Sequence, residues 1–177
     1  MNSRAVFLTR DGIFNHHVLR AGVQTSPRHW DEVKEYSQLE QIRELRQSGF
    51  QIVFILNQPD LDKKTNNPLF IRTLNETYRR RFEINAVYVC PAEAHDDPFK
   101  KPNPGMFLEA AKELKIDLSK SFHLGDNATE KFAAERAGCT FLLWDRPYNQ
   151  DLVTKHRVNT MSEVVNLILN ETPSVLS

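Results

Sequence analysis

Cysteine, net charge and long apolar runs are the scarce features of this 177-residue sequence. Its two cysteines, Cys90 and Cys139, are too few for a disulfide framework and lie in apolar segments, so we predict buried thiols in a reducing compartment. Lysine plus arginine and aspartate plus glutamate both number 23, and a net charge of zero gives no support for nucleic acid or an anionic membrane as the main partner. No apolar stretch is long enough to span a bilayer, and the first residues lack the apolar segment of a signal peptide. We therefore expect a cytoplasmic protein that binds neither nucleic acid nor membrane.

The apolar segments that are present alternate with stretches of helical spacing. Apolar residues make up 40% and charged residues 26% of the chain, and the length suits a single domain over residues 1–177, with a tail that frays after about residue 170. Strands are predicted at 5–8, 51–56, 86–90, 121–124 and 139–144, with a sixth beginning near Val158. Helices are predicted at 33–48, within 61–81, and at 104–114, 129–137 and 161–169, and a polar loop fills 9–30. This alternation predicts an α/β fold with a mostly parallel sheet that helices cover on both faces.

Polar side chains gather where the predicted strands end. The set consists of Thr9, Arg10 and Asp11 after the first strand, Asn57 and Gln58 after the second, Lys100 and Lys101 ahead of the third helix, and Asp126 and Glu130 after the fourth strand. Open parallel sheets bind ligands beyond the carboxyl ends of their strands. Taken singly each signal is weak, since a lone Lys101 is most often a surface lysine and Asp126 most often a helix cap. Together they predict a polar pocket suited to a phosphate and a divalent cation, because magnesium prefers oxygen ligands and lysine neutralises phosphoryl charge.

These segments also resemble those of a known family. The stretches that carry the resemblance are Val6-Phe7-Leu8 with Arg10-Asp11-Gly12, Gly49 to Gln58, Lys101-Pro102-Asn103-Pro104-Gly105-Met106, and Leu124-Gly125-Asp126 through Cys139. On these stretches the chain resembles the haloacid dehalogenase (HAD) superfamily, and within it the D,D-heptose 1,7-bisphosphate phosphatase and histidinol-phosphate phosphatase group. The resemblance implies a HAD-like Rossmann fold with little or no cap domain.

The resemblance implies a role for each matching position. In the family, an aspartate that ends the first strand attacks the phosphoryl group, and a second aspartate two residues later acts as general acid and then as base. Asp11 holds that second position, and Lys101 holds the position of the lysine that steadies the phosphoryl charge. Asp126 and Asp11 hold the magnesium positions, with Glu130 as a weaker supporting acid. The predicted substrate contacts are Arg10, Asn57, Gln58 and Lys100.

Three positions depart from the family pattern. Thr9 stands where the nucleophilic aspartate is expected, Leu56 stands where a phosphate-binding hydroxyl is expected, and Ile13 replaces a usual threonine. A threonine hydroxyl is a poor nucleophile without an adjacent base, and losing a nucleophile removes almost all of the rate. We therefore predict a catalytically impaired protein whose magnesium binding is weakened by the loss of the first carboxylate. An alternative left open at this point is that Asp11 activates Thr9 as a substitute nucleophile.

Three other sequence features could suggest a metal or binding site, but we do not assign them one. Many relatives carry a zinc-binding loop with several cysteines and a histidine, whereas residues 90–97 keep only Cys90 and His95, so we predict that zinc is not bound. The neighbours His16 and His17 are predicted to point apart and to line a substrate-access loop or face solvent. The basic run at residues 79–81 is predicted to be the solvated face of a helix.

Three functions remain for such a chain. The first, which we rank highest, is a degenerate HAD protein that binds a small phosphorylated metabolite or a protein partner. The second is a working magnesium-dependent phosphatase that acts on a small phosphorylated sugar or amino alcohol by an altered or slow mechanism. The third is a pure interaction protein that uses the surface of residues 30–36, Phe70 and the basic run. We expect a monomer in each case.

Overall fold

A six-stranded parallel sheet forms the centre of the computed structural model, which describes residues 3–171. The strands are β1 (Arg4–Leu8), β4 (Phe50–Asn57), β5 (Ala86–Cys90), β6 (Phe122–Gly125), β7 (Thr140–Trp144) and β8 (His156–Val158). Their order across the sheet is β5-β4-β1-β6-β7-β8, and every neighbouring pair is parallel. The carboxyl ends of β1, β4 and β6 therefore lie side by side at one edge of the sheet.

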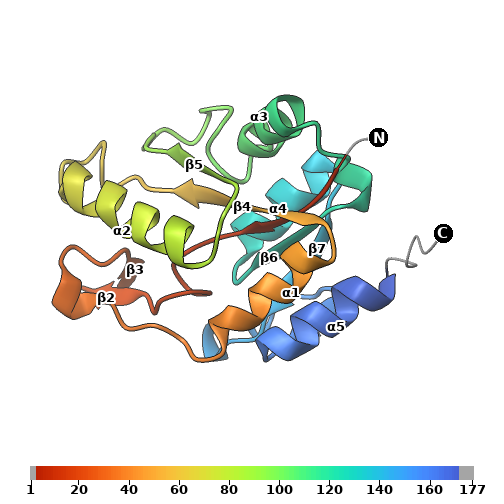
Figure 1. Ribbon diagram of the computed structural model, residues 1–177. Helices are drawn as coiled ribbons and strands as arrows, with labels where there is room; N and C mark the ends of the chain where they lie inside the picture. Colours follow the sequence, from red (N-terminus) through yellow and green to blue (C-terminus); the bar gives the residue numbers. More distant parts are fainter. Residues whose placement is uncertain (1–2, 172–177) are drawn as a thin grey trace.

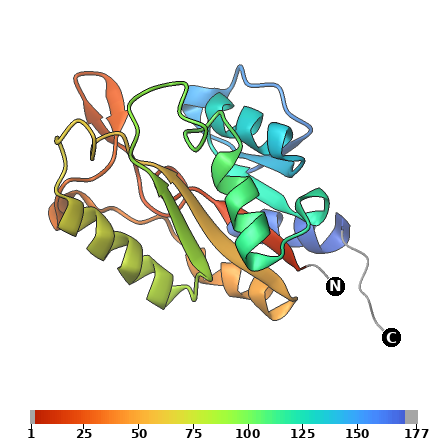
Figure 2. The same cartoon turned by 90° about the horizontal axis from the view of Figure 1, so that it is seen from above.

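Helices cover both faces of this sheet (Figures 1 and 2). The helices α1 (Ile42–Gln47), α2 (Pro68–Arg81) and α5 (Met161–Glu171) pack on one face, and α3 (Gly105–Leu114) and α4 (Ala128–Ala137) pack on the other. Single 3-10 turns lie at η1 (Trp30–Glu32), η2 (Leu39–Gln41), η3 (Leu118–Lys120) and η4 (Pro147–Asn149). Side chains of β1 alternate between two apolar cores, with Val6 and Leu8 in one and Ala5 and Phe7 in the other. The predicted α/β fold class is confirmed.

The helix predicted at 33–48 is shorter than its spacing indicated. Regular α-helix begins at Ile42, after the η2 turn. The preceding residues are held by backbone pairing instead, because Tyr36 N–H donates to the Phe14 carbonyl and His16 N–H donates to the Lys34 carbonyl. Tertiary pairing with the turn after β1 thus replaces the first part of the predicted helix.

The predicted polar loop at 9–30 contains a two-stranded hairpin, which the prediction of a loop did not include. Its strands β2 (Val18–Arg20) and β3 (Val23–Thr25) are antiparallel and flank a two-residue turn, Ala21-Gly22, in which both φ angles are positive. Such turns match the twist of a hairpin, and Gly22 adopts its conformation without strain. The sequence signal for this hairpin is the pair of short segments with β-forming residues, 18–20 and 23–25, on the two sides of Ala21-Gly22.

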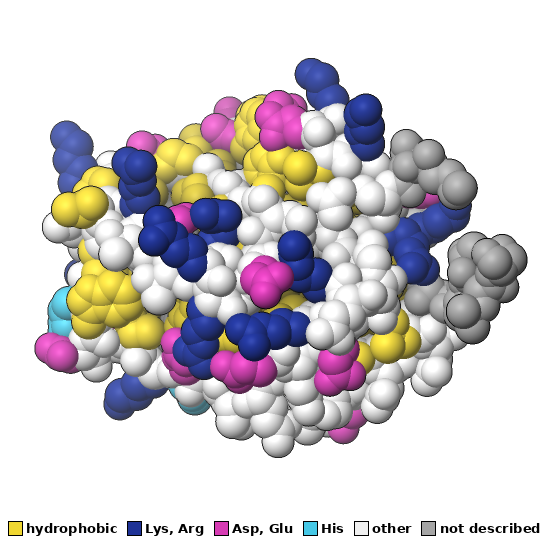
Figure 3. Space-filling model, viewed as in Figure 1, with side chains coloured by type: hydrophobic (Ala, Val, Ile, Leu, Met, Phe, Trp, Pro, Cys, Tyr) yellow, Lys and Arg dark blue, Asp and Glu magenta, His cyan; other side chains and the backbone are white. Residues whose placement is uncertain are grey.

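The two cysteines and the basic run lie where the sequence predicted them. Cys90 and Cys139 are buried, free thiols, as predicted. The basic run lies on the solvent-facing side of α2, where its arginines make ion pairs with Glu35, Glu40 and Glu76. Figure 3 shows charges of both signs interspersed over this face. Within residues 3–171, no helix is long and apolar enough to cross a bilayer. Most of the tail predicted to fray lies outside the described residues.

Candidate active site

Two adjoining cavities open at the carboxyl edge of the sheet. The inner cavity has a volume of about 540 Å³, and the outer cavity has a volume of about 990 Å³. Predicted site residues that line the inner cavity are Thr9, Asp11, Asn57, Gln58, Lys101 and Glu130, whereas Asp126 lines the outer one. The two share His17, Val23, Gln24, Asn127 and Ala128. The fold therefore brings residues from four distant segments to one place, as the strand-end argument predicted.

Asp11, at the general-acid position, is held by hydrogen bonds from four protein side chains. Arg10 donates from Nε to Oδ1 at 3.0 Å and from Nη2 to Oδ2 at 2.8 Å, so the guanidinium grips both carboxylate oxygens. Asn15, Ser26 and Gln58 donate to the same carboxylate at 2.9, 2.5 and 3.4 Å. Burial by itself raises the pKa of Asp11, but the Arg10 charge and the Ser26 and Asn15 bonds outweigh it and leave the pKa below the ordinary aspartate value. Asp11 is thus held ionised, which opposes a role as proton donor.

Thr9, at the predicted nucleophile position, lines the inner cavity, and within residues 3–171 its hydroxyl makes no hydrogen bond to a base. Its side chain lies at the carboxyl end of β1 and is 7% exposed. The four side chains that donate to Asp11 do not include Thr9. A hydroxyl that is to attack phosphorus needs a partner that accepts its proton. The structure gives Thr9 no such activation.

Lys101 and Glu130 form a buried ion pair at the opposite side of the inner cavity. The Lys101 ammonium donates to Glu130 Oε1 at 2.6 Å and to the Ile55 carbonyl at 2.9 Å. Burial raises the pKa of Glu130, and the Lys101 charge offsets only part of that rise. An ammonium has three N–H donors, so one remains for a ligand.

Local backbone contacts position this pair. Asn57, the last residue of β4, exchanges two hydrogen bonds of 3.0 Å with the Lys101 main chain. Asn127 caps α4 by accepting from the Glu130 N–H, and the Glu130 carboxylate accepts from the Asp126 N–H in return. This reciprocal arrangement satisfies two backbone donors at the start of the helix. The lysine and the acid are therefore fixed by secondary-structure ends.

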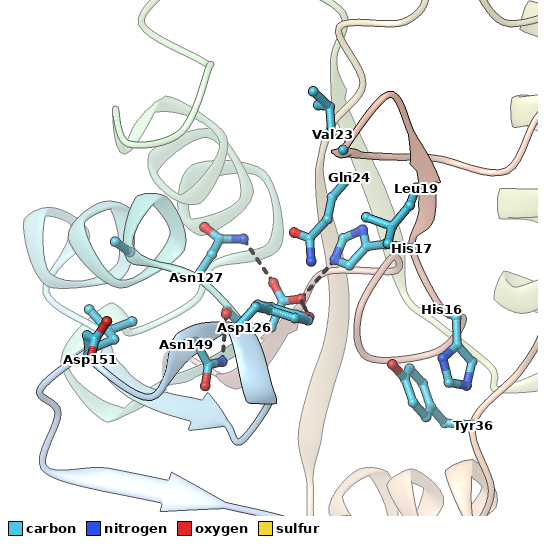
Figure 4. Close-up of a pocket in the computed structure, with 14 residues that line it drawn as sticks. His16, His17, Leu19, Val23, Gln24, Tyr36, Asp126, Asn127, Asn149 and Asp151 are labelled. Atoms are coloured by element: carbon cyan, nitrogen blue, oxygen red, sulfur yellow. Dashed lines mark hydrogen bonds and ion pairs between the residues drawn. The ribbon is translucent and has the colours of Figure 1, made fainter.

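Asp126, at the magnesium position, is bonded to side chains from two other parts of the chain (Figure 4). His17 Nε2 lies 2.9 Å from Oδ2, the Tyr148 hydroxyl donates to the same oxygen, and Asn127 donates to Oδ1 at 2.9 Å. Burial lowers the pKa of His17, but its bond to Asp126 and the nearby acids outweigh that and leave the pKa raised. The same bond lowers the pKa of Asp126 against the effect of burial. His17 and Tyr148 thus meet at one carboxylate oxygen.

The carboxylates present do not fit a magnesium ion well. Magnesium prefers near-octahedral oxygen coordination and usually binds through one or two carboxylates. Thr9 supplies none, and each carboxylate of Asp11, Asp126 and Glu130 already accepts hydrogen bonds from protein donors. Among the described residues, no group of three or more His, Cys, Asp or Glu side chains could hold a metal ion.

Three predicted residues lie away from the cavities. Arg10 is completely buried. Its guanidinium donates to the Asp11 carboxylate and, at 2.6 Å, to Asn75 Oδ1. Leu56, at the phosphate-hydroxyl position, is 1% exposed and belongs to an apolar core. The Lys100 ammonium donates to the Glu93 carbonyl in the loop before α3. These three side chains are not among the described residues that line either cavity.

Several residues at the site were not singled out from the sequence. Ser26, the residue after the hairpin, bonds to Asp11, and Tyr148 comes from the η4 turn after β7. His16 and His17 do point apart, since His16 stacks on Tyr36 with ring centres 3.9 Å apart. His17, however, turns inward to Asp126 and has 17% of its side chain exposed. The position of Tyr148 just after a predicted strand was a signal that could have placed it at this edge.

Comparison with known proteins agrees with this architecture. The model of the family described as polynucleotide kinase 3 phosphatase matches residues 13–161, a match that begins just after Asp11. A D-glycero-beta-D-manno-heptose-1,7-bisphosphate 7-phosphatase from Vibrio cholerae is 30% identical over 154 residues, which cover 78% of each chain. The enzyme of the same description from Rhodopseudomonas palustris is 29% identical over 147 residues, 76% of this chain and 79% of that one.

A solved structure shows the same fold. D,D-heptose 1,7-bisphosphate phosphatase from B. bronchiseptica, complexed with magnesium and phosphate, superimposes with a TM-score of 0.79 at 22% identity, covering 96% of this chain and 99% of that chain. The resemblance drawn from the sequence motifs is confirmed. The chain belongs to the polynucleotide kinase 3 phosphatase family of the HAD superfamily and is related to the heptose bisphosphate phosphatases.

Proposed function

We propose that this chain is a HAD-fold protein that binds a small phosphorylated metabolite and is impaired in hydrolysing it. The observation that carries the proposal is the state of the first-strand motif. Within residues 3–171 the Thr9 hydroxyl makes no hydrogen bond to a base, and Asp11 is locked to Arg10 through both carboxylate oxygens. A phosphoaspartate route needs a carboxylate nucleophile and a proton donor, and this motif offers neither.

The inner cavity supports binding of a phosphoryl group. Lys101 has one ammonium N–H left for a ligand, and Ala128 and Thr129 line the cavity at the beginning of α4. The start of a helix carries free N–H groups and a partial positive charge, which favour an anion. Gln58 and Ser26 add polar side chains on the opposite wall. A phosphate monoester is the ligand that these groups suit, and magnesium contributes less to its binding than in a site with a first-strand carboxylate.

A second candidate function is slow phosphatase activity. Membership of a phosphatase family and the presence of Lys101 and Asp126 at the expected positions favour it. In this version Asp11 takes the proton of Thr9, which requires Asp11 to release at least one of its present donors. A protein partner remains a prediction.

An activity panel tests the proposal. The native chain, Thr9→Asp and Asp11→Asn are assayed with magnesium on phosphorylated sugars and on histidinol phosphate. We expect no turnover from the native chain or from Asp11→Asn. Turnover by Thr9→Asp would show that the missing carboxylate at this position is the main defect. Turnover by the native chain that Asp11→Asn abolishes would establish the slow phosphatase and overturn the proposal.

Binding is tested by thermal shift with inorganic phosphate and sugar phosphates. A ligand that binds the folded state raises the melting temperature by mass action. We expect a rise for the native chain that is lost in Lys101→Met. The matched control is Lys100→Met, since the neighbouring Lys100 ammonium bonds to Glu93 outside the cavity and its removal leaves the rise intact. A native chain that shows no rise with any phosphate would refute a phosphate pocket.

A further inference from the structure

The side chains around Asp126 form a small, closed arrangement. His17 reaches it from the segment before β2, and Tyr148 reaches it from η4, so the two donors are more than a hundred residues apart in sequence. The Asp126 side chain is 1% exposed. Both donors meet at Oδ2, the oxygen that faces Gly12 in the turn after β1, while Asn127 donates to Oδ1. Figure 4 shows His17 and Asn127 bonded to the Asp126 carboxylate.

The turn after β1 closes over this contact. At Gly12 a side chain would place its Cβ 2.0 Å from Asp126 Oδ2 and 2.8 Å from His17 Nε2, so only glycine fits. Arg146 fastens the same turn by donating to the Gly12 carbonyl at 3.0 Å, and its guanidinium stacks 4.1 Å from the centre of the Tyr36 ring. The contact between His17 and Asp126 is therefore packed from several sides.

We infer that His17 and Tyr148 fill the cation position at Asp126 with protein donors, so that this chain holds its phosphate ligand without a divalent cation. The inference deepens the proposed function and rests on it for the ligand. A carboxylate oxygen that accepts an N–H and an O–H has its hydrogen-bonding capacity used. A metal ion that binds Oδ2 would have to displace both donors, and the end of β1 offers it Thr9 instead of a further carboxylate.

The groups that remain for a phosphoryl ligand are consistent with this arrangement. Lys101 keeps one free N–H, and α4 begins at the same wall of the inner cavity. Both favour an anion without the help of a metal. The ligand class is thus a phosphate monoester that binds equally well with magnesium and with a chelator.

Direct titration of manganese, followed by electron paramagnetic resonance without phosphate or substrate, tests the inference. We expect no tight binding to the native chain. Freeing Asp126 in the double variant His17→Ala/Tyr148→Phe is expected to tighten binding by about tenfold to a hundredfold, because two hydrogen bonds to a charged group no longer compete. Adding Asp126→Asn to the double variant is expected to remove the gain.

Two single variants serve as controls. His16→Ala removes the neighbouring imidazole, which stacks on Tyr36 away from Asp126, and is expected to bind manganese no better than the native chain. His17→Gln keeps an amide N–H donor for Asp126 and is expected to gain less than His17→Ala. Circular dichroism and melting curves establish that each variant is folded; should the double variant unfold, the difference between His17→Ala and His17→Gln decides the question.

The outcomes separate this inference from the proposed function. Tight manganese binding by the native chain that His17→Ala weakens would make His17 a metal ligand and overturn the inference. A thermal shift by inorganic phosphate that appears only with magnesium would also overturn it, while leaving phosphate binding in place. A shift that persists in chelator supports it. Turnover by the native chain would defeat the proposed function whatever the manganese titration gives.

Discussion

The turn after β1 and the turn after β6 bring acidic residues to the same sheet edge but hold them in different ways. After β1, Asp11 is gripped by its neighbour Arg10 and by side chains of the loop. After β6, Asp126 and Glu130 belong to the start of α4, where Asn127 caps the helix and Glu130 binds the Asp126 N–H. The acids after β6 stabilise the fold, so their presence is not a measure of catalysis. The informative position is Thr9, which carries no comparable structural duty.

The contrast between the two turns is tested most severely by removing Glu130, for which we expect the largest loss of stability. Glu130→Ala leaves the Lys101 ammonium, whose side chain is 2% exposed, buried without its carboxylate. We expect the free energy of unfolding in urea to fall by about 3 to 5 kcal/mol. The control is the double variant Glu130→Leu/Lys101→Met, which removes both charges and is expected to lose much less. Equal losses in the single and double variants would show that the ion pair is not what stabilises this turn.

Acid titration probes the β1 side of the comparison. The pKa of Asp11 is lower in the folded chain than the ordinary value of 3.8, so its contribution to stability is fully present above that value and is lost as pH falls through the folded pKa. Asp11→Asn has no carboxyl group to protonate. We expect its free energy of unfolding, measured in urea from neutral pH to below 3.8, to decline less steeply than that of the native chain.

A helix cap gives a smaller effect on the β6 side. Asn127→Ala removes the side chain that accepts from the Glu130 N–H, and we expect a loss of about 1 kcal/mol. The matched variant is Asn67→Ala, since Asn67 caps α2 by accepting from the Leu69 N–H at 2.9 Å. A loss at Asn127 well beyond that at Asn67 would show that the bond from Asn127 to Asp126 adds to the cap.

The smallest effect is expected at Thr9 itself. Within residues 3–171, the Thr9 hydroxyl has no hydrogen-bond partner, so Thr9→Val should change the free energy of unfolding by no more than about 0.5 kcal/mol. Chemical denaturation of the two proteins side by side measures it. A loss as large as that of Asn127→Ala would assign Thr9 a structural role and weaken the contrast between the two turns.

The sequence predicted the sheet and both helical layers, because those depend on local periodicity. It also placed polar residues at the strand ends where the two cavities open. Asn57, Lys101 and Glu130 were found because each lies near the end of an element whose pattern is strong: Asn57 at the end of β4, Lys101 shortly before α3, and Glu130 in the first turn of α4. The helix at 33–48 was overextended because backbone pairing with the turn after β1 decided its first part. Such pairing leaves no trace in the spacing of apolar residues.

The inward turn of His17 could not be predicted by the same means. Its partner Asp126 is 109 residues away, and the contact depends on the closed turn at Gly12 and on the hairpin that follows. From the sequence, His16 and His17 look alike, and only the packing against Tyr36 separates them. The departures from the family motif at Thr9 and Leu56 can be seen in the sequence. The donors around Asp126 can be identified only from the three-dimensional structure.

The two hydrogen bonds between Asn57 and the Lys101 main chain have a consequence for affinity. Because Asn57 ends a core strand, the lysine backbone is immobilised when the sheet forms, and Glu130 with the Ile55 carbonyl fixes its ammonium. Ordering a free lysine side chain costs up to about 2 kcal/mol of conformational entropy. The lysine side chain is already ordered when the protein has folded. A ligand that enters the inner cavity therefore loses no binding free energy to ordering this cation.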